Sequence, residues 1–257
     1  MMKSFIRVFV LSALLLGTAS GLLSAEDAPL EAVFDSGYWV TRPSGSAITV
    51  FGVAGRRGNR DEGVRLALLD AARKAALYHG LHGESVAVLN QGAGALDYFS
   101  DFDYRLELRR NPEEFLDALI FDRDRNLLEK NGIVLVRVRY TGVSDIPPYN
   151  SVLEDGVPDW TKKYVVTIPG FMAGIGYSKN KGSFQKTYEA SYENALVSLL
   201  PQLSTRVDSN TSDVAGGRSS HNVTRSAGDL TGVMILETWF DRRVNAVWTL
   251  VAARAQD

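Results

Sequence analysis

Two pairs of alternate carboxylates are among the side chains of this chain best suited to chemistry. Asp101 and Asp103 flank one phenylalanine, and Asp122 and Asp124 flank one arginine. On a β-strand the members of each pair would share a face, where carboxylates transfer protons or bind a divalent cation. Arginines are interleaved with both pairs, so we interpret both as solvated ion pairs.

The histidines are His79, His82 and His221. We expect the first two at the C-terminus of a helix, where the helix dipole favours a partly charged imidazole. A metal site would need a third ligand of matching geometry, and their spacing offers none nearby. We therefore expect capping or solvation for this pair, and an exposed His221 in a polar loop.

A glycine-rich turn over residues 52–58 resembles a phosphate-binding loop only loosely. No GK[ST] sequence follows it, and no acidic residue lies at the position that a dinucleotide-binding unit requires. We interpret the glycines as a tight turn that lets a helix approach a strand closely. The second interpretation is an anion site built from the arginines of this turn: Arg56, Arg57 and Arg60.

Sequence motifs of common enzymes are missing from the chain. There is no GxSxG, no HExxH and no cysteine nucleophile. Sequons at Asn210 and Asn222 match the glycan acceptor pattern, which occurs often by chance. We explain Trp239 and Trp248 by cross-strand packing in the last hairpin. The sequence therefore predicts a non-enzymatic protein, with no catalytic, cofactor-binding or metal-binding residue and no cofactor.

The element that must position these residues is the unit from Ile48 to Gly80. Residues 48–53 are mostly β-branched or aromatic and predict a strand. A helix should follow, capped by Asn59 or Asp61 and ended by Gly80. Its apolar stripe has three- and four-residue spacing. Asp70 and Lys74 lie off this stripe, and we expect them to pair on the solvated face. The stripe contains Val64, Ala67, Leu68, Ala71, Ala75 and Tyr78.

Further elements complete this first unit. Asn131-Gly132 is a strong hairpin signal, and it is followed by alternating valines that predict a strand with one solvated face. Alternation over 102–108 predicts another strand with one apolar face. Pro112 to Leu119 begins with a helix-start signature and predicts a short helix. The whole unit is β-α-β-β.

A second copy of this unit follows Trp160, 121 residues after Trp39. Gly174 and Gly176 correspond to Gly52 and Gly55, and a second amphipathic helix follows them. Pro201 predicts a kink or an early end of that helix. The copy closes with a strand, a polar turn and a strand. Residues 208–228 between helix and strands are polar, and composition leaves a long hairpin and a loop both open.

The predicted fold is therefore α+β, with two tandem β-α-β-β modules, each a small antiparallel sheet packed on one helix. The predicted boundaries are a signal peptide at 1–25, a flexible leader at 26–37, a first module at 38–142, a linker at 143–158 and a second module at 159–257.

The N-terminal segment predicts export. Lys3 and Arg7 precede an apolar run of signal-peptide length, and small residues end at Ala25. The run is shorter than the roughly 20 residues of a membrane span, and an uncleaved anchor stays the alternative. Without cysteine the chain has no acceptor for lipid and no disulfide. The net charge of −2 does not favour nucleic acid as a partner.

The second unit resembles the twenty-kilodalton outer-membrane lipoprotein family of motile bacteria. The resemblance is carried by PDW at 158–160, GIGY at 174–177, EASYENAL at 189–196 and the closing hairpin. It implies a compact non-enzymatic module of the cell envelope, linked in some relatives to the outer membrane or to flagella. This chain lacks the lipidation cysteine of that family, so we expect a periplasmic or outer-membrane-associated protein that is not lipid-anchored.

The expected mode of action is binding or assembly. We expect envelope proteins or copies of the chain itself as partners, with outer membrane or peptidoglycan as further candidates. Exposed sheet edges and the loops 83–101 and 208–228 are the expected contact regions. The alternative is a small-ligand or metal-binding protein with a site between the modules that uses Asp101, Asp103, His79 or His82.

Overall fold

A computed structural model describes residues 28–41, 43–44, 47–91, 98–144, 146–149, 151–163, 165–203, 205–214 and 217–255. Residues 43–44, 88–91, 98–101, 205–214, 217–222 and 255 are described by their backbone alone. The predicted signal peptide lies outside the described residues.

The chain folds as a mixed α+β protein with antiparallel sheets, which confirms the predicted class. A seven-stranded sheet has the order β11-β14-β13-β4-β5, with β1 and β12 also paired to β13, and a five-stranded sheet joins β2, β3, β8, β6 and β7. The helices are α1 (Leu30–Ser36), α2 (Arg60–His79), η1 (Pro112–Ala118), α3 (Arg123–Asn126), η2 (Asp159–Lys162), α4 (Phe184–Val197) and η3 (Leu200–Gln202).

The strands complete the list of elements. They are β1 (Tyr38–Val40), β2 (Pro43–Ser44), β3 (Ala47–Gly55), β4 (Leu81–Gln91), β5 (Tyr98–Leu108), β6 (Leu119–Ile120), β7 (Leu127–Lys130), β8 (Ile133–Thr141), β9 (Leu153–Glu154), β10 (Val157–Pro158), β11 (Met172–Lys179), β12 (Thr205–Val214), β13 (Gly217–Asp241) and β14 (Ala246–Ala255).

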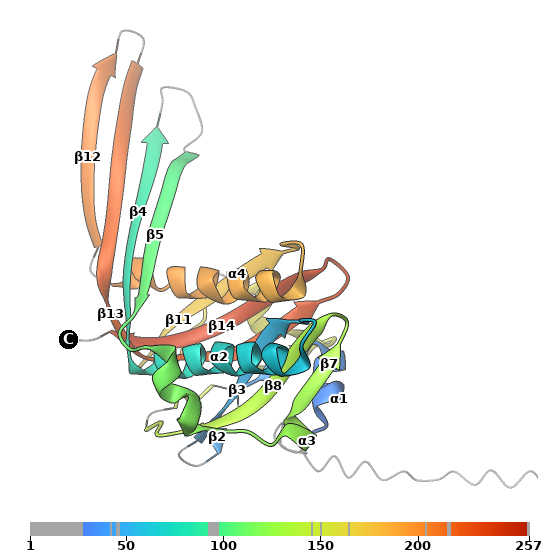
Figure 1. Cartoon of the computed structure of the whole chain (residues 1–257). Helices are drawn as coiled ribbons and strands as arrows, with labels where there is room; N and C mark the ends of the chain where they lie inside the picture. Colours follow the sequence, from blue (N-terminus) through green and yellow to red (C-terminus); the bar gives the residue numbers. More distant parts are fainter. Residues whose placement is uncertain are drawn as a thin grey trace, which may run out of the picture.

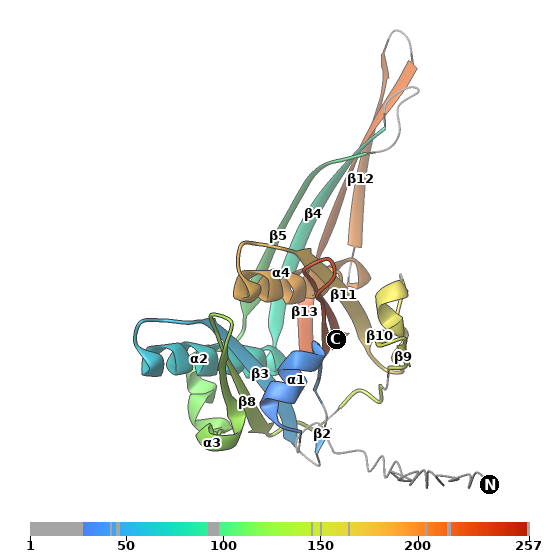
Figure 2. The same cartoon turned by 90° about the vertical axis from the view of Figure 1, so that its right-hand side faces the viewer.

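The two halves of the chain share one sheet. β1, β4 and β5 belong to the first half, yet β1 and β4 pair directly with β13 of the second half, and β5 pairs with β4. The arrangement of two separate modules, each with its own small sheet, is therefore not confirmed. α2 packs on β3 and β8, and α4 packs on β11 and β14 (Figures 1 and 2).

The predicted leader is wrong over its described part. Residues 30–36 form α1, and Leu30, Val33 and Phe34 are buried. The ring of Phe34 lies 6.4 Å from Trp39 and 6.2 Å from Phe184. Three apolar residues at helical spacing are enough to fasten this segment to the core, because they bury most of the apolar surface it carries.

The predicted start and end of α2 are confirmed. Asn59 accepts a hydrogen bond from the Asp61 amide, and the helix ends before Gly80. The glycine turn also acts as expected, because a Cβ on Gly52 would lie 2.0 Å from the carbonyl oxygen of Ala67. Only a glycine allows α2 to lie this close to β3.

The same contact recurs between β11 and α4. A Cβ on Gly176 would lie 1.9 Å from the carbonyl oxygen of Ser191. Ser191 is the eighth residue of α4, as Ala67 is the eighth of α2. Gly176 therefore holds the position against α4 that Gly52 holds against α2, whereas the sequence pattern matched Gly176 to Gly55. α4 ends at Val197 and Pro201 lies in η3, which confirms the predicted early end.

Several local predictions are also confirmed. Asn131 and Gly132 have φ of 54° and 77° and join β7 to β8. Residues 112–118 are helical, although the helix is of the 3₁₀ type. Trp239 and Trp248 face each other in the β13–β14 ladder. Residues 205–214 and 217–226 pair as a long hairpin, which decides between the two interpretations of that region.

Candidate functional site

A four-stranded arm is the most prominent feature of the surface. β12, the first half of β13, β4 and β5 run side by side and rise away from the helices (Figures 1 and 2). Each half of the chain contributes one hairpin to this arm. The predicted contact regions, 83–101 and 208–228, are thus arm strands in large part, and not loops.

The arm forms because β13 is unusually long. Its 25 residues pair with β14 and β1 in the body and continue beside β4 and β12 in the arm. A register shift between Thr231 and Met234 lies close to the point where the arm leaves the body. Bulges of this kind bend and twist a strand, so one strand can serve both parts.

β5 presents two different faces. Phe102, Tyr104, Leu106 and Leu108 share one face, because residues two apart point to the same side of a strand. Phe102 is 50% exposed and Tyr104 40% exposed, with ring centroids 6.1 Å apart. The predicted apolar face of this strand therefore exists, but its outer half is open to solvent.

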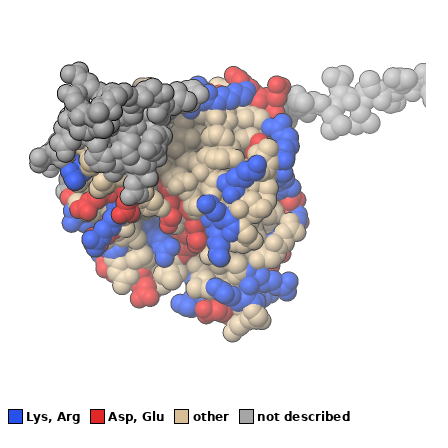
Figure 3. Space-filling view, turned by 90° about the horizontal axis from the view of Figure 1, so that it is seen from above, with Lys and Arg blue, Asp and Glu red and all other residues tan. Residues whose placement is uncertain are grey.

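An apolar groove of about 220 Å³ lies at the base of the arm, between α2, α4 and β5. Figure 3 shows a hollow of uncharged residues on this side, bordered by acidic and basic side chains. The exposed rings of β5 continue the apolar surface upward. The groove is lined by Arg73, Leu77, Leu81, Leu106, Leu108, Tyr192, Glu193 and Leu196.

Three ionisable side chains border this groove: Arg73, Tyr192 and Glu193. Burial, together with the neighbouring carboxylate of Glu189, raises the pKa of Glu193. Burial likewise raises the pKa of Tyr192, so its hydroxyl stays protonated. Arg73 lies beside that hydroxyl. These lining residues provide donors and acceptors at the rim of an apolar surface, but no nucleophile paired with a base.

Asp70 and Lys74 pair as predicted, but they are not on a solvated face. They are only 7% and 6% exposed, and Lys74 Nζ lies 2.5 Å from Asp70 Oδ2. The Val53 amide donates to that carboxylate and Lys74 donates to the Phe51 carbonyl, both at 2.7 Å. The prediction failed because α4 covers the side of α2 that a single sheet would leave open.

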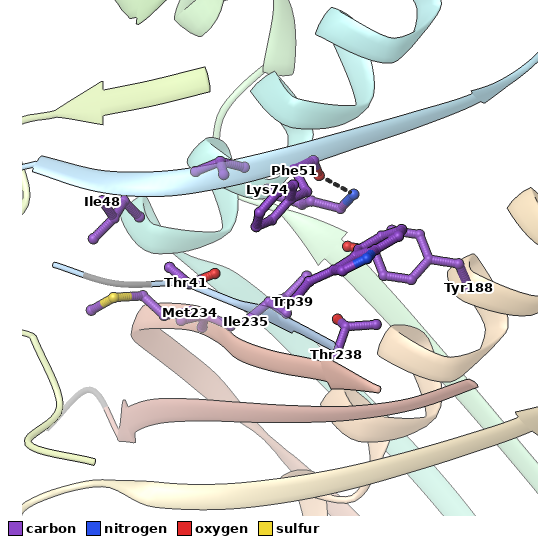
Figure 4. Close-up of a pocket in the computed structure, with 11 residues that line it drawn as sticks. Trp39, Thr41, Ile48, Phe51, Lys74, Tyr188, Met234, Ile235 and Thr238 are labelled. Carbon is purple, nitrogen blue, oxygen red and sulfur yellow. Dashed lines mark hydrogen bonds between the residues drawn. The ribbon is translucent and has the colours of Figure 1, made fainter. Parts of the chain in front are cut away.

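Lys74 lies at the point where the layers meet. Its Nζ is 4.3 Å from the ring centroid of Tyr188 on α4, a cation–π contact. Figure 4 shows Lys74, Trp39 and Tyr188 converging around a cavity of about 20 Å³. A space of this size admits no more than a water molecule. This junction therefore holds the elements together and has no room for a substrate.

A second buried polar cluster surrounds Glu237. This residue of β13 is 3% exposed, and its carboxylate accepts hydrogen bonds from Trp160 Nε1 at 2.5 Å and from the Tyr38 hydroxyl at 2.7 Å. Burial raises the pKa of Glu237, and these hydrogen bonds oppose that effect. The cluster connects η2, which contains Trp160, to β1 and β13 of the seven-stranded sheet.

The histidines have separate roles. His79 ends α2, bonds the Tyr140 hydroxyl and stacks on Phe115 at 4.8 Å. Burial and the nearby Arg110 lower its pKa. His82 lies on β4 and bonds Asp229 at 2.7 Å, which raises its pKa.

A metal site is not assembled in the described part of the chain. There, no three side chains of His, Cys, Asp or Glu gather closely enough to hold an ion. His221 and Asp101 are described by their backbone alone, at arm positions in β13 and β5. The alternative prediction used Asp101, Asp103, His79 or His82. Of these, His79 bonds the Tyr140 hydroxyl, His82 bonds Asp229, and Asp103 faces Val86 across the β4–β5 ladder.

The other candidates act locally. Asp122 accepts from the Asp124 amide and caps α3, so this pair does not lie on a strand as expected. Arg60 pairs with Glu129, while Arg56 and Arg57 are exposed. In the arm ladder Asn210 lies opposite His221, and Asn222 lies opposite Ser209.

No family model, curated protein or solved structure matches the chain. The function must therefore be inferred from the site itself. No helix among the described residues is long and apolar enough to cross a bilayer.

Sequence reasoning missed the groove and the pairing of β4 with β13. The leucines of the groove lie on four elements, α2, β4, β5 and α4, so no local pattern connects them. The one available signal was Leu106 and Leu108, which continue the alternation of Phe102 and Tyr104.

Proposed function

We propose that this protein is an exported, non-enzymatic component of the cell envelope that acts by binding or assembly through its arm. The observation that carries the proposal is the arm itself. Its outer strands, β5 and β12, each pair on one side only within the described residues. Open strand edges are templates for pairing with another chain, and natural proteins usually protect them.

The proposal includes an origin by tandem duplication. Two pairs of contacts support it. In each pair, both residues of the contact in the second half lie 124 positions after the two residues of the contact in the first half. Gly52 and Gly176 each approach the eighth residue of a helix. The Asp70 carboxylate accepts from the Val53 amide, and the Asn194 amide donates to the Tyr177 carbonyl. In this interpretation each repeat supplies one strand, one helix and one arm hairpin.

The groove supports binding because it extends the exposed rings of β5 onto the body. A partner lying along β5 would find backbone donors and acceptors at the edge, then Tyr104, and then the leucines of the groove. Such a surface combines hydrogen-bond register with apolar contact, which is how strand addition obtains both affinity and specificity. The resemblance to the outer-membrane lipoprotein family would place this activity in the periplasm or at the outer membrane.

The experiment compares the intact protein with an arm-shortened variant in the cells that produce it. Residues 87–102 and residues 208–223 are each replaced by Asn-Gly. The two-residue turns then connect Val86 to Asp103 and Val207 to Thr224, which are pairs that face each other in the ladders. Crosslinking followed by envelope fractionation should give products with the intact chain that the variant loses. An equal pattern of products from both chains, or a chain that stays in the cytoplasm, would contradict the proposal.

A further inference from the structure

The free edge of β5 carries a charge pattern of its own. Asp103, Arg105 and Glu107 alternate along the face opposite the aromatic residues. Across the β4–β5 ladder Arg105 faces Glu84, whereas Asp103 faces Val86. The ladder thus offers Arg105 an acidic neighbour but offers Asp103 no cation. A cation of another chain can face Asp103 only from the open side of the strand.

A second β5 supplies that cation if it runs antiparallel to the first. With the two-fold axis at Tyr104, each Asp103 faces Arg105 of the other copy, and this happens twice. On the other face the same register places Tyr104 against Tyr104 and Phe102 against Leu106, again twice. Facing residues in an antiparallel pair lie on the same side of the sheet, so charged positions meet charged positions and apolar positions meet apolar ones.

Neighbouring registers place like charges on the two-fold axis itself. An axis at Asp103 pairs Asp101 with Arg105 twice, but it sets the two Asp103 carboxylates against each other at the centre of the interface. An axis at Arg105 sets two arginines face to face there and also pairs Asp103 with Glu107. An axis at Leu106 pairs Arg105 with Glu107, but it leaves only residues 104–108 facing within the strand, since β5 ends at Leu108. The axis at Tyr104 keeps residues 101–107 paired in regular register, because the β4–β5 ladder has a register shift between Asp101 and Phe99. A two-fold axis that passes between two adjacent residues of β5 would pair odd-numbered with even-numbered positions, and so would set charged side chains against apolar ones.

We propose that two copies of this chain associate through β5, antiparallel and symmetric about Tyr104. The two arms then form one continuous sheet across the interface, with the same patch used by both copies. This inference rests on the proposed function, and it names a second copy of the chain as the partner at this edge.

The pairing has one unfavourable contact at each end. Asp101 faces Glu107 of the other copy by register, and like charges in facing positions destabilise a ladder. Within one chain Glu107 already pairs with Arg105. Replacing Glu107 by lysine would turn the end contact into an attractive one, although it removes the bond to Arg105.

Cysteine scanning tests the register directly, because the natural chain contains no cysteine. In the full chain, Tyr104→Cys places the two thiols on the two-fold axis, where facing Cβ atoms are close enough for a disulfide on oxidation. Leu106→Cys is the matched control, because its thiol would face Phe102. We expect a disulfide-linked dimer from the first variant and little from the second. Linking at residue 106 in place of 104, or no linking at either, overturns the proposal.

Charge exchange tests the same register without cysteine. Asp103→Arg and Arg105→Asp should each weaken the dimer roughly tenfold, because each variant converts two attractive pairs into repulsive ones. The double variant D103R/R105D restores both pairs and should recover most of the affinity in sedimentation equilibrium. Circular dichroism confirms that each variant folds. Equal affinities for all variants, or a monomer at every concentration, would overturn the self-association.

The two proposals can fail separately. A chain that stays monomeric but still forms arm-dependent crosslinks to another envelope protein would end the inference about β5 and leave the binding function standing. A β5 dimer of the purified protein, together with no arm-dependent crosslink in the envelope, would end the proposed binding function and leave the inference about β5 standing.

Discussion

Charged side chains in the interior of this protein are retained only where backbone groups accompany them. Lys74 donates to the carbonyl of Phe51, and Asp70 accepts from the amide of Val53, so β3 itself satisfies part of the helix-borne pair. Desolvation of two charges costs several kcal/mol per ion unless geometry and extra hydrogen bonds offset it. The pair therefore fixes the position of α2 along β3 more than it adds net stability.

Removing one member of this pair should be strongly destabilising. Lys74→Met leaves the Asp70 carboxylate buried without its cation, and we expect a loss of about 3–5 kcal/mol in the free energy of unfolding. Urea denaturation measures it. Arg65→Met is the control, because Arg65 pairs with Glu62 on the exposed face of the same helix and should change little. Equal effects of both substitutions would show that Lys74 is not effectively buried.

Glu237 gives stability a pH dependence of defined sign. Its folded pKa is raised above the ordinary 4.5, mainly by burial, so the folded state holds this proton more tightly than the unfolded chain. The associated stability is present below about pH 4.5 and is lost as pH rises through the folded pKa. Glu237→Gln keeps an acceptor for Trp160 and removes the buried charge.

The variant should therefore gain stability relative to the natural chain as pH rises. Urea denaturation of both proteins across pH 4 to 8 isolates the group, because other titrations cancel in the difference. A stability difference that stays constant over this range would contradict the assigned pKa shift. A difference of opposite sign would mean that the ionised carboxylate is the stabilised form.

At the scale of elements, glycines set each of the two long helices against its strand: Gly52 for α2, and Gly174 and Gly176 for α4. Gly52 and Gly176 allow carbonyl oxygens of α2 and α4 to approach the strands more closely than any side chain permits. Gly52→Ala and Gly176→Ala should each cost about 1–3 kcal/mol or more, since a helix must shift to admit the methyl group. Thermal unfolding measures the loss.

Gly58→Ala is the matched control for these two variants. A Cβ at Gly58 would meet nothing within 4 Å, and its φ is not left-handed. Its effect should stay within about 1 kcal/mol and tend toward stabilisation, because alanine reduces the freedom of the unfolded chain. A control as damaging as Gly52→Ala would show that the turn, and not the helix–strand contact, requires glycine.

Elements with a strong local signal could be predicted from the sequence, and elements held by distant partners could not. β3, α2, the Asn131-Gly132 turn and the final hairpin each carry their own pattern of spacing or turn residues. α1 was missed because it spans two turns only, and the sharing of one sheet by both halves was missed because β4 meets its partner β13 far away in the chain.

The candidate site shows the same division. The alternation of Phe102 to Leu108 is visible in the sequence and marks one wall of the binding surface. The other walls come from α2 and α4, whose inward sides are defined only when both helices are in place. For the same reason Asp70 and Lys74, four residues apart, had the spacing of a solvated pair but lie inside the molecule.

At the scale of the whole molecule, the body and the arm should separate in stability and function. The two hydrophobic clusters lie in the body, around α2 and α4, and their buried members do not reach past Leu81 on β4 or Leu230 on β13 into the upper arm. The arm-shortened variant, with 87–102 and 208–223 each replaced by Asn-Gly, keeps these clusters. It should therefore retain cooperative unfolding with a midpoint close to that of the natural chain.

The same variant should weaken self-association, because it removes residues 98–102 of β5, and with them the contact of Phe102 with Leu106 of the other copy, and residues 208–214 of β12. Differential scanning calorimetry and sedimentation velocity on one sample report the two properties independently. A shortened protein that unfolds without cooperativity would mean that the arm is part of the folding unit. A shortened protein that keeps both its midpoint and the affinity of its dimer would show that the removed residues make no contact between the two copies.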